Sequence, residues 1–411
     1  MKRYARDKSD PLVKPVEKIE LSEKNLRLRA VFAIIFFVIG ITAIGFGVKS
    51  CLEGNSGWQI IEIPQSKDSL ASELTVMYNP GHGDKSIASE RKAVNLLCTS
   101  AMKDACLMFD PFCEGGYITA INTSQGQPVK VPGRLYAAFE EMEKSGSRLL
   151  YYGPYYEILY QTLGAGDDYS ASVTDPGMSA ETRELFDKIS VYVNDDNAVK
   201  LQLLGNDTVK LGLSAAYAQF ARENGIDVFI DFGWLKNAFA VDLVADALTD
   251  GGYTNGFVSS CDGFSRYLNG KEYTYDVTLY KNVDGGPAEA ARFGIGQIAS
   301  GVLFHNMKLN SIEGVYRYGD GKTVTLYTDK DGSQAAAADS MYVYSSSLSC
   351  SQTALYGADA YLRKQPDTAT VRSIGEKGVK TAYLSGNTVF CLPALDGGIQ
   401  LADGYEVKTV E

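Results

Sequence analysis

The segment spanning residues 230–263 constrains the fold more than any other part of the sequence. The apolar residues before Asp231 predict a strand that ends at this position, and Gly233 permits a tight turn directly after it. An amphipathic helix is expected next, because apolar residues recur on one face at helical spacing: Val241, Val244, Ala245 and Leu248. The Gly251-Gly252 pair closes this helix, and residues 257–259 are typical of the following strand.

Local chemistry leaves two interpretations of this turn open. A carboxylate at a strand end, a glycine that permits close backbone approach and a helix N-terminus together suit a phosphate-bearing ligand. Alternatively, Asp231 and Gly233 only shape the passage from strand to helix.

Strands and helices alternate over the rest of the chain. Helices are expected at residues 93–109, 134–144, 182–189, 215–223, 351–363 and 368–376. Strands are expected at residues 73–77, 199–204, 208–213, 274–280, 314–318, 323–327, 341–345, 381–385 and 388–392. Many of these strands are linked as hairpins, which favours an α+β fold with mixed and antiparallel sheets over a doubly wound sheet. In the helix at 134–144, a solvated face is expected from the acidic run of Glu140, Glu141 and Glu143.

An uncharged segment near the N-terminus predicts a membrane anchor. Residues 30–48 contain no charged side chain over 19 positions. At about 1.5 Å per residue, this length nearly matches the roughly 30 Å hydrocarbon core of a bilayer. Nine basic residues precede the segment against five acidic ones, so the N-terminus is expected in the cytoplasm and the body outside the cell membrane. The chain then divides into a basic tail (1–29), a transmembrane helix (30–48), a spacer (49–71), a folded domain (72–395) and a C-terminal tail (396–411).

The cysteines and histidines leave the redox state open. Cys51 directly follows the uncharged segment, but Lys49 suits a lipoprotein signal poorly, so an uncleaved anchor is favoured over lipid attachment. The other cysteines fit either one or two disulfides or buried thiols: Cys98, Cys106, Cys113, Cys261, Cys350 and Cys391. These cysteines have no CxxC spacing and His82 and His305 are the only histidines, so no zinc site is expected.

The charge distribution argues against nucleic acid as a partner. The whole chain carries −11 and the first 29 residues carry +4, so residues 30–411 carry −15. An acidic body of this kind repels a polyanion, whereas one locally positive pocket still permits a small anionic ligand.

Residues 230–264 resemble, without a gap, the core block of the FAD:protein FMN transferase family, the ApbE type. That block runs approximately I-D-L-G-G-I-A-K-G-Y-A-V-D, a helix, G-x-x-N and V-N-x-G-G-D-I. This chain and the family block have the same residue at the following positions: Asp231, Gly233, Ala240, Val241, Asp242, Gly252, Asn255 and Val258. Segments 117–122, 128–131 and 345–355 follow the family's order on either side, so the resemblance covers roughly residues 72–395.

The resemblance implies a reaction and a site. It implies that FAD is the substrate, that Mg²⁺ acts at its pyrophosphate, and that FMN moves to a Thr of a partner protein outside the cytoplasmic membrane, with release of AMP. It places the cofactor at Asp231, Gly233, Asn237 and Asp242. It places the metal at the Trp234 carbonyl, Ser349 and Thr353.

The sequence departs from the family at three of these positions. Trp234 replaces the second Gly of D-x-G-G, Asn237 stands at the family Lys, and Ser349 stands at its metal-binding Asp. Mg²⁺ is usually held by one or two carboxylates, so the loss at Ser349 bears directly on catalysis. Two functions therefore remain: an active membrane-anchored transferase, or a catalytically eroded relative. The latter would act as a flavin- or nucleotide-binding or scaffold protein in extracytoplasmic electron-transfer assembly.

Overall fold

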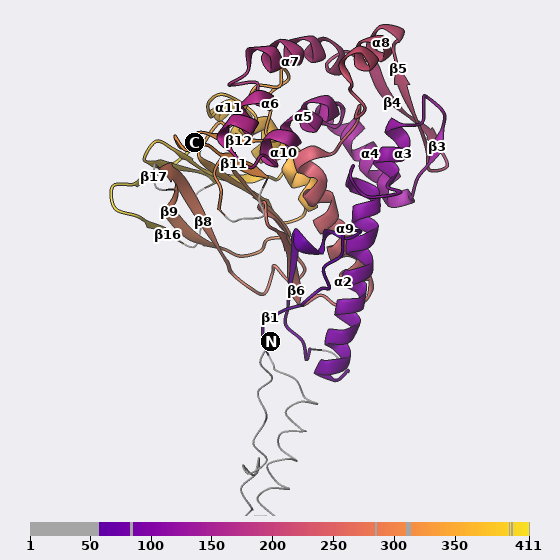
Figure 1. Cartoon of the computed structure of the whole chain (residues 1–411). Helices are drawn as coiled ribbons and strands as arrows, with labels where there is room; N and C mark the ends of the chain where they lie inside the picture. Colours follow the sequence, from indigo (N-terminus) through magenta and orange to yellow (C-terminus); the bar gives the residue numbers. More distant parts are fainter. Residues whose placement is uncertain are drawn as a thin grey trace, which may run out of the picture. The chain divides into compact units, whose positions relative to one another are not determined.

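The central element of the fold is a nine-stranded sheet with the strand order β1-β2-β6-β7-β10-β13-β14-β15-β17. Figure 1 shows the elements of the chain, with β1, β6 and β17 of this sheet labelled. The computed structural model describes residues 57–82, 85–283, 286–309, 314–393, 395 and 398–410. The strands of this sheet are β1 (Gln59–Ile60), β2 (Leu74–Tyr78), β6 (Gly256–Ser260), β7 (Phe264–Tyr267), β10 (Ser300–His305), β13 (Ser340–Ser345), β14 (Lys380–Ser385), β15 (Thr388–Leu392) and β17 (Glu406–Thr409). Neighbouring strands are antiparallel, except that β15 and β17 run parallel.

A smaller sheet covers one face of the central sheet. It consists of β8 (Tyr275–Val283), β9 (Gly286–Ile295) and β16 (Ile399–Leu401), in the order β16-β9-β8. Alternate side chains of β13 point to opposite faces, as the pleat of a strand requires. Tyr342 and Tyr344 join the core with β8 and β9, whereas Met341 and Val343 join the larger core with the helices. Strand β13 is therefore buried along its whole length.

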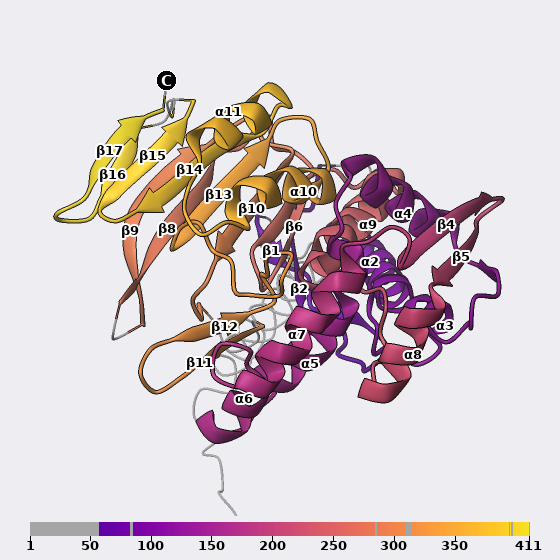
Figure 2. The same cartoon turned by 90° about the horizontal axis from the view of Figure 1, so that it is seen from above.

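Helices cover the other face of the central sheet (Figure 2). These are α2 (Ile87–Phe109), α9 (Lys236–Asp250), α10 (Cys350–Tyr361) and α11 (Thr368–Glu376). The other α-helices of the described residues are α3 (Tyr117–Asn122), α4 (Gly133–Ser145), α5 (Gly153–Leu163), α6 (Asp168–Thr174), α7 (Ala180–Val193) and α8 (Ala215–Asn224). With them lie a sheet of β3 (Val129–Lys130), β5 (Thr208–Leu213) and β4 (Val199–Gly205), and a hairpin of β11 (Val315–Arg317) and β12 (Thr323–Thr325). The expected α+β class is confirmed.

The predicted strand before Asp231 is wrong. Residues 226–232 form no strand, and the chain passes through a short 3₁₀ turn at Gly233–Leu235 into α9. The side chain of Asn122 supplies the hydrogen bonds that a neighbouring strand would otherwise make. Its Oδ1 accepts from the amides of Phe229 and Ile230 at 3.0 Å, and its Nδ2 donates to the Ile230 carbonyl at 2.9 Å. The Asn122 side chain thus satisfies three backbone groups of residues 229 and 230, so Ile230 stays buried without entering a sheet.

The folded body extends beyond residues 72–395 at both ends. Strand β1 pairs with β2 on the N-terminal side, within the expected spacer. On the C-terminal side, β16 pairs with β9 and β17 pairs with β15, within the expected tail. The predicted anchor at 30–48, the basic tail and Cys51 lie outside the described residues. Within the part that the structure describes, no helix has the length and apolar character needed to cross a membrane.

Candidate functional site

A pocket of about 500 Å³ opens beside the turn that precedes α9. We call it the site pocket. It is lined by residues from several segments: Ser72, Glu73, Tyr160, Leu163, Gly164, Gly233, Trp234, Lys236, Asn237, Cys261, Asp262, His305, Lys308, Gly314, Val315, Thr325, Leu326 and Tyr327. Its volume falls within the roughly 300–1,000 Å³ typical of small-molecule sites.

Asp231 lies beneath the wall of the pocket and holds the turn. It is fully buried, its Oδ1 accepts from the Gly233 amide at 2.8 Å, and its Oδ2 accepts from the Tyr160 hydroxyl at 3.1 Å. Gly233 has a φ of 54°, and a Cβ at this position would overlap the ring of Tyr156. The turn therefore requires glycine for two independent reasons, a left-handed backbone and a close approach.

A charged network lines the floor of the pocket. The ammonium of Lys236 lies 2.9 Å from Glu73 Oε1 and 3.4 Å from Asp110 Oδ2. The adjacent Asn237 donates from Nδ2 to Glu73 Oε2 and to Asp262 Oδ2, both at 3.0 Å. Two carboxylates thus contact the ammonium, and a third, that of Asp262, joins the network through Asn237. The network carries an excess of negative charge when all three carboxylates are ionised.

Three buried polar atoms of pocket-lining residues are unsatisfied. Trp234 Nε1, Asn237 Oδ1 and Asp262 Oδ1 have no partner in hydrogen-bond geometry among the described residues, although the Tyr156 hydroxyl neighbours Trp234 and Ser260 neighbours Asp262. Asn237 and Trp234 are only 2% and 5% exposed, so bulk water does not freely satisfy these atoms. A buried donor or acceptor without a partner costs about 1–3 kcal/mol. Because each of these atoms has almost no accessible surface, a ligand in the pocket reaches it only after a side chain moves.

The electrostatics of the pocket change around neutral pH. Burial raises the pKa of Asp231 to about 7, although hydrogen bonds from Gly233 and Tyr160 partly offset the effect. Burial also raises the pKa of Asp262 to about 6. Burial lowers the pKa of His305 to about 4, so this ring is neutral at physiological pH, with Nδ1 2.8 Å from the Met307 carbonyl. The two carboxyl groups therefore take up protons between about pH 8 and 5.

Trp234 is packed among aromatic side chains. Its ring centroid lies 5.2 Å from that of Tyr327, 5.7 Å from that of Phe304 and 6.3 Å from that of Phe264. The indole thus fills the space that a glycine at the same position would leave open. Tyr327 also lines the pocket, so an aromatic surface stands beside the acidic floor.

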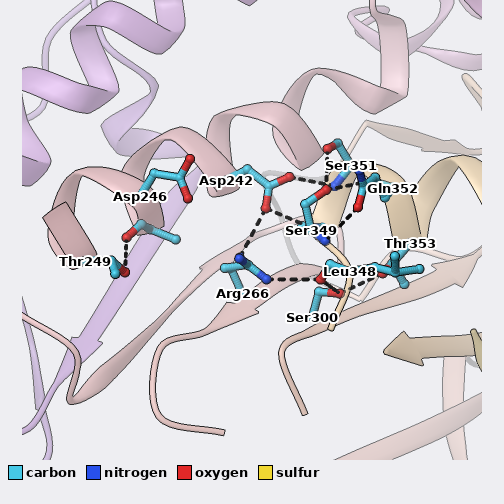
Figure 3. Close-up of polar contacts among 12 residues, drawn as sticks. Asp242, Asp246, Thr249, Arg266, Ser300, Leu348, Ser349, Ser351, Gln352 and Thr353 are labelled. Carbon is cyan, nitrogen blue, oxygen red and sulfur yellow. Dashed lines mark hydrogen bonds and ion pairs between the residues drawn. The ribbon is translucent and has the colours of Figure 1, made fainter. Parts of the chain in front are cut away.

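The other three residues expected in the site form a separate network at the start of α10 (Figure 3). Asp242, on α9, accepts from the amides of Cys350 and Ser351 at 2.8 Å, and Arg266 lies 3.5 Å away. Ser349 is the N-cap of α10 and accepts from the Gln352 amide at 3.1 Å. Thr353 lies 2.7 Å from the Ser300 hydroxyl. None of the three lines the site pocket.

This network does not fit a magnesium ion. The hydroxyls of Ser349 and Thr353 are already engaged, and the Asp242 carboxylate caps two amides and faces Arg266. Within the described chain, no group of three or more His, Cys, Asp or Glu side chains is placed to hold a metal ion. Mg²⁺ is usually held by one or two carboxylates, and an ion at these positions would compete with Arg266 and two backbone amides for the Asp242 carboxylate.

Sequence reasoning missed several residues of both networks. Three residues contact the turn from distant elements: Glu73 directly before β2, Asp110 directly after α2, and Tyr160 in α5. No local sequence pattern connects these three residues. The acidic run in α4 was expected to be solvated, but Oε1 of Glu141 is buried without a partner. Burial raises the pKa of Glu141 to about 7, and the nearby Asp242 carboxylate adds to the increase.

Comparison with known proteins establishes the fold. No family model matches the sequence, and no curated protein matches it. Among solved structures, the ApbE protein of Thermotoga maritima is similar, with a TM-score of 0.55 and 13% identity over 84% of this chain and 97% of that chain. The flavin transferase ApbE of Vibrio cholerae has a TM-score of 0.49 and 12% identity, over 85% of this chain and 99% of that chain. The first likeness shows that this chain has the fold of the Thermotoga protein.

Proposed function

We propose that this protein binds FAD in the site pocket and acts as a membrane-anchored FAD:protein FMN transferase. FMN would pass to a Thr of an extracytoplasmic partner protein, with release of AMP. One observation carries the proposal: in a chain with the ApbE fold, a pocket of about 500 Å³ opens at the Asp231–Gly233 turn, where the sequence resembles the core block of the family. The anchor and the location rest on the uncharged segment at residues 30–48.

The chemistry of the pocket suits the flavin ring of FAD better than it suits the pyrophosphate of FAD. The pocket lining combines a carboxyl group, that of Asp262, a side-chain amide, that of Asn237, and the aromatic ring of Tyr327. A flavin ring carries both an N–H donor and carbonyl acceptors along its edge, and its flat face can stack on an aromatic side chain. The carboxylates around Lys236 would repel a pyrophosphate that lay directly on them. We therefore place the ring over the floor and the phosphates toward Lys308 at the rim.

A second candidate function is a flavin- or nucleotide-binding protein without transferase activity. The specific observation in its favour is that Ser349 and Thr353 make structural hydrogen bonds where the family holds its metal. Mg²⁺ does not fit this arrangement, which favours flavin binding without transfer. Such a protein would serve as a scaffold or flavin carrier in the assembly of electron-transfer proteins outside the membrane.

Titration of the full chain in detergent with FAD, with and without Mg²⁺, tests both functions. Flavin fluorescence reports binding, and chromatography of the supernatant reports AMP. Binding together with AMP release supports the transferase. Binding without AMP release, in the presence of Thr-containing candidate acceptors, favours the second function. If FAD does not bind at micromolar concentrations, both are refuted. Asn237→Leu provides a matched test, because it removes a polar side chain of the pocket lining at similar volume and should weaken FAD binding about tenfold.

A further inference from the structure

Two cysteine sulfurs lie in contact at the point where α2 ends. Cys106 belongs to the last turn of α2, and Cys113 lies in the loop between α2 and α3. Their Sγ atoms are 2.8 Å apart, and the two residues are 2% and 4% exposed. A disulfide bond is about 2.05 Å long, so less than about 1 Å of movement separates this contact from a covalent bond.

The backbone holds the two cysteines in this position. The Asp110 amide donates to the Cys106 carbonyl at 3.0 Å, and the Cys113 amide donates to the Asp110 carbonyl at 3.3 Å. The Gly116 amide then donates to the Cys113 carbonyl at 2.9 Å. These successive turns fold the chain back on the end of α2, so the approach of the two sulfurs is built into the local structure.

The loop between the two cysteines contacts the site pocket twice. Asp110 Oδ2 lies 3.4 Å from the ammonium of Lys236. The ring of Phe112 meets the ring of Tyr160 at a centroid distance of 5.0 Å, and Tyr160 donates to Asp231. Both contacts originate inside the ring that a bond between Cys106 and Cys113 would close.

We propose that Cys106 and Cys113 form a reversible disulfide that fixes this loop against the site pocket. The oxidant is a disulfide compound, either a small molecule or a protein. One cysteine thiolate attacks a sulfur of the oxidant, which forms a mixed disulfide and releases one thiol. The second cysteine then attacks the first cysteine's sulfur and releases the other thiol. The pair loses two protons and two electrons, and the oxidant becomes two thiols.

The oxidised and reduced states differ in how firmly the loop is held. The covalent ring restricts residues 107–112, so Asp110 and Phe112 stay in contact with Lys236 and Tyr160. In the reduced state, the loop can open without breaking a covalent bond. Burial raises the pKa of the Cys106 thiol, and the hydrogen bond with Cys113 adds to the increase. Thiolate is therefore scarce at neutral pH, and exchange should become faster as the pH rises.

Peptide mapping of the full chain tests the bond. The protein in detergent is incubated with oxidised glutathione, denatured, treated with N-ethylmaleimide and digested with trypsin. Both cysteines fall in the tryptic peptide 104–130, whereas Cys98 falls in the peptide 93–103. We expect peptide 104–130 to carry no maleimide and to be two hydrogen atoms lighter than the dithiol, and we expect Cys98 to be alkylated. Recovery of peptide 104–130 with two maleimides, or with glutathione retained, overturns the proposal.

Hydrogen exchange tests the consequence for the pocket without any flavin. Oxidation should slow amide exchange in residues 107–113 and in the turn at 231–237 at least threefold. Cys113→Ser should abolish this response. Cys98→Ser, which replaces another buried cysteine of α2, should retain it. Equal exchange in the oxidised and reduced wild type would refute the link to the pocket. Because no flavin is present, failure of the flavin proposal would leave this result unchanged.

Discussion

The Tyr160 hydroxyl donates a 3.1 Å hydrogen bond to Oδ2 of the fully buried Asp231. Since Oδ1 of the same carboxyl group accepts from the Gly233 amide, both oxygens have partners inside the protein. Asp231 therefore supports the wall of the site pocket from behind. Its effect on a ligand acts through the positions of Gly233 and Tyr160, both of which line the pocket.

Replacement of Asp231 by Asn should alter the pH dependence of stability. Burial raises the pKa of Asp231 from 3.8 to about 7 in the folded state. Between these two values the unfolded chain has released its proton and the folded chain has not, so the wild type loses stability as the pH rises. The loss is complete above about pH 7 and amounts to about 4 kcal/mol, at roughly 1.36 kcal/mol per pKa unit.

Urea unfolding of wild type and Asp231→Asn at pH 4, 6 and 8 measures this effect. Asn does not titrate, so the free energy of unfolding of the variant should increase relative to that of the wild type from pH 4 to 8. Asp195→Asn, at an exposed loop carboxylate, is the control and should follow the wild type. Parallel stability curves for wild type and Asp231→Asn would contradict the raised pKa.

Binding of FAD should strengthen as the pH falls from 8 to 5. The carboxyl groups of Asp231 and Asp262, with pKa values of about 7 and 6, become neutral over this range. Lys236 remains charged, so the pocket becomes less negative and repels the pyrophosphate less. We expect about a tenfold gain in affinity by isothermal titration calorimetry. Riboflavin, which lacks phosphate, is the matched ligand and should show a flatter profile; an equally steep profile would count against this explanation.

Gly233→Ala should destabilise the protein more than Gly252→Ala. Both glycines have positive φ angles, 54° and 81°. A Cβ at Gly252 meets no atom within 4 Å, whereas a Cβ at Gly233 overlaps the Tyr156 ring. Gly252→Ala should therefore cost only backbone strain, about 1–2 kcal/mol, and Gly233→Ala should add about 1–3 kcal/mol of overpacking. Thermal unfolding measures both, and equal costs would show that the Tyr156 ring yields freely.

Ser349→Ala should affect stability and leave FAD binding unchanged. Ser349 caps α10 in a capping box with Gln352 and does not line the site pocket. Loss of an N-cap hydroxyl typically costs about 1 kcal/mol. Ser214→Ala, at the N-cap of α8, provides a control of the same chemistry in another helix. If Ser349→Ala weakened FAD binding tenfold while Ser214→Ala did not, Ser349 would belong to the ligand site after all.

Local sequence patterns determined much of the fold. Ser214 before an apolar-periodic run and Gly225 after it predict α8, and the structure has this helix at Ala215–Asn224 with those two residues as caps. The Gly205-Asn206-Asp207 turn likewise predicts the hairpin of β4 and β5. These features depend on residues a few positions apart, so a single sequence contains the required information. The run before Asp231 misled the same reasoning because its hydrogen-bond partner, Asn122, lies more than a hundred residues away.

The sequence by itself determined the α+β class, most helices, the uncharged segment at 30–48 and the importance of the Asp231–Asn237 turn. Only the tertiary structure decided which side chains meet at that turn. Lys236 finds Glu73 and Asp110 there, and Asn237 meets Asp262. The tertiary structure also places Asp242, Ser349 and Thr353 outside the pocket, in hydrogen bonds at the start of α10. The physical reason is that a pocket is assembled from chain segments far apart in sequence, whereas periodicity and capping report only on near neighbours.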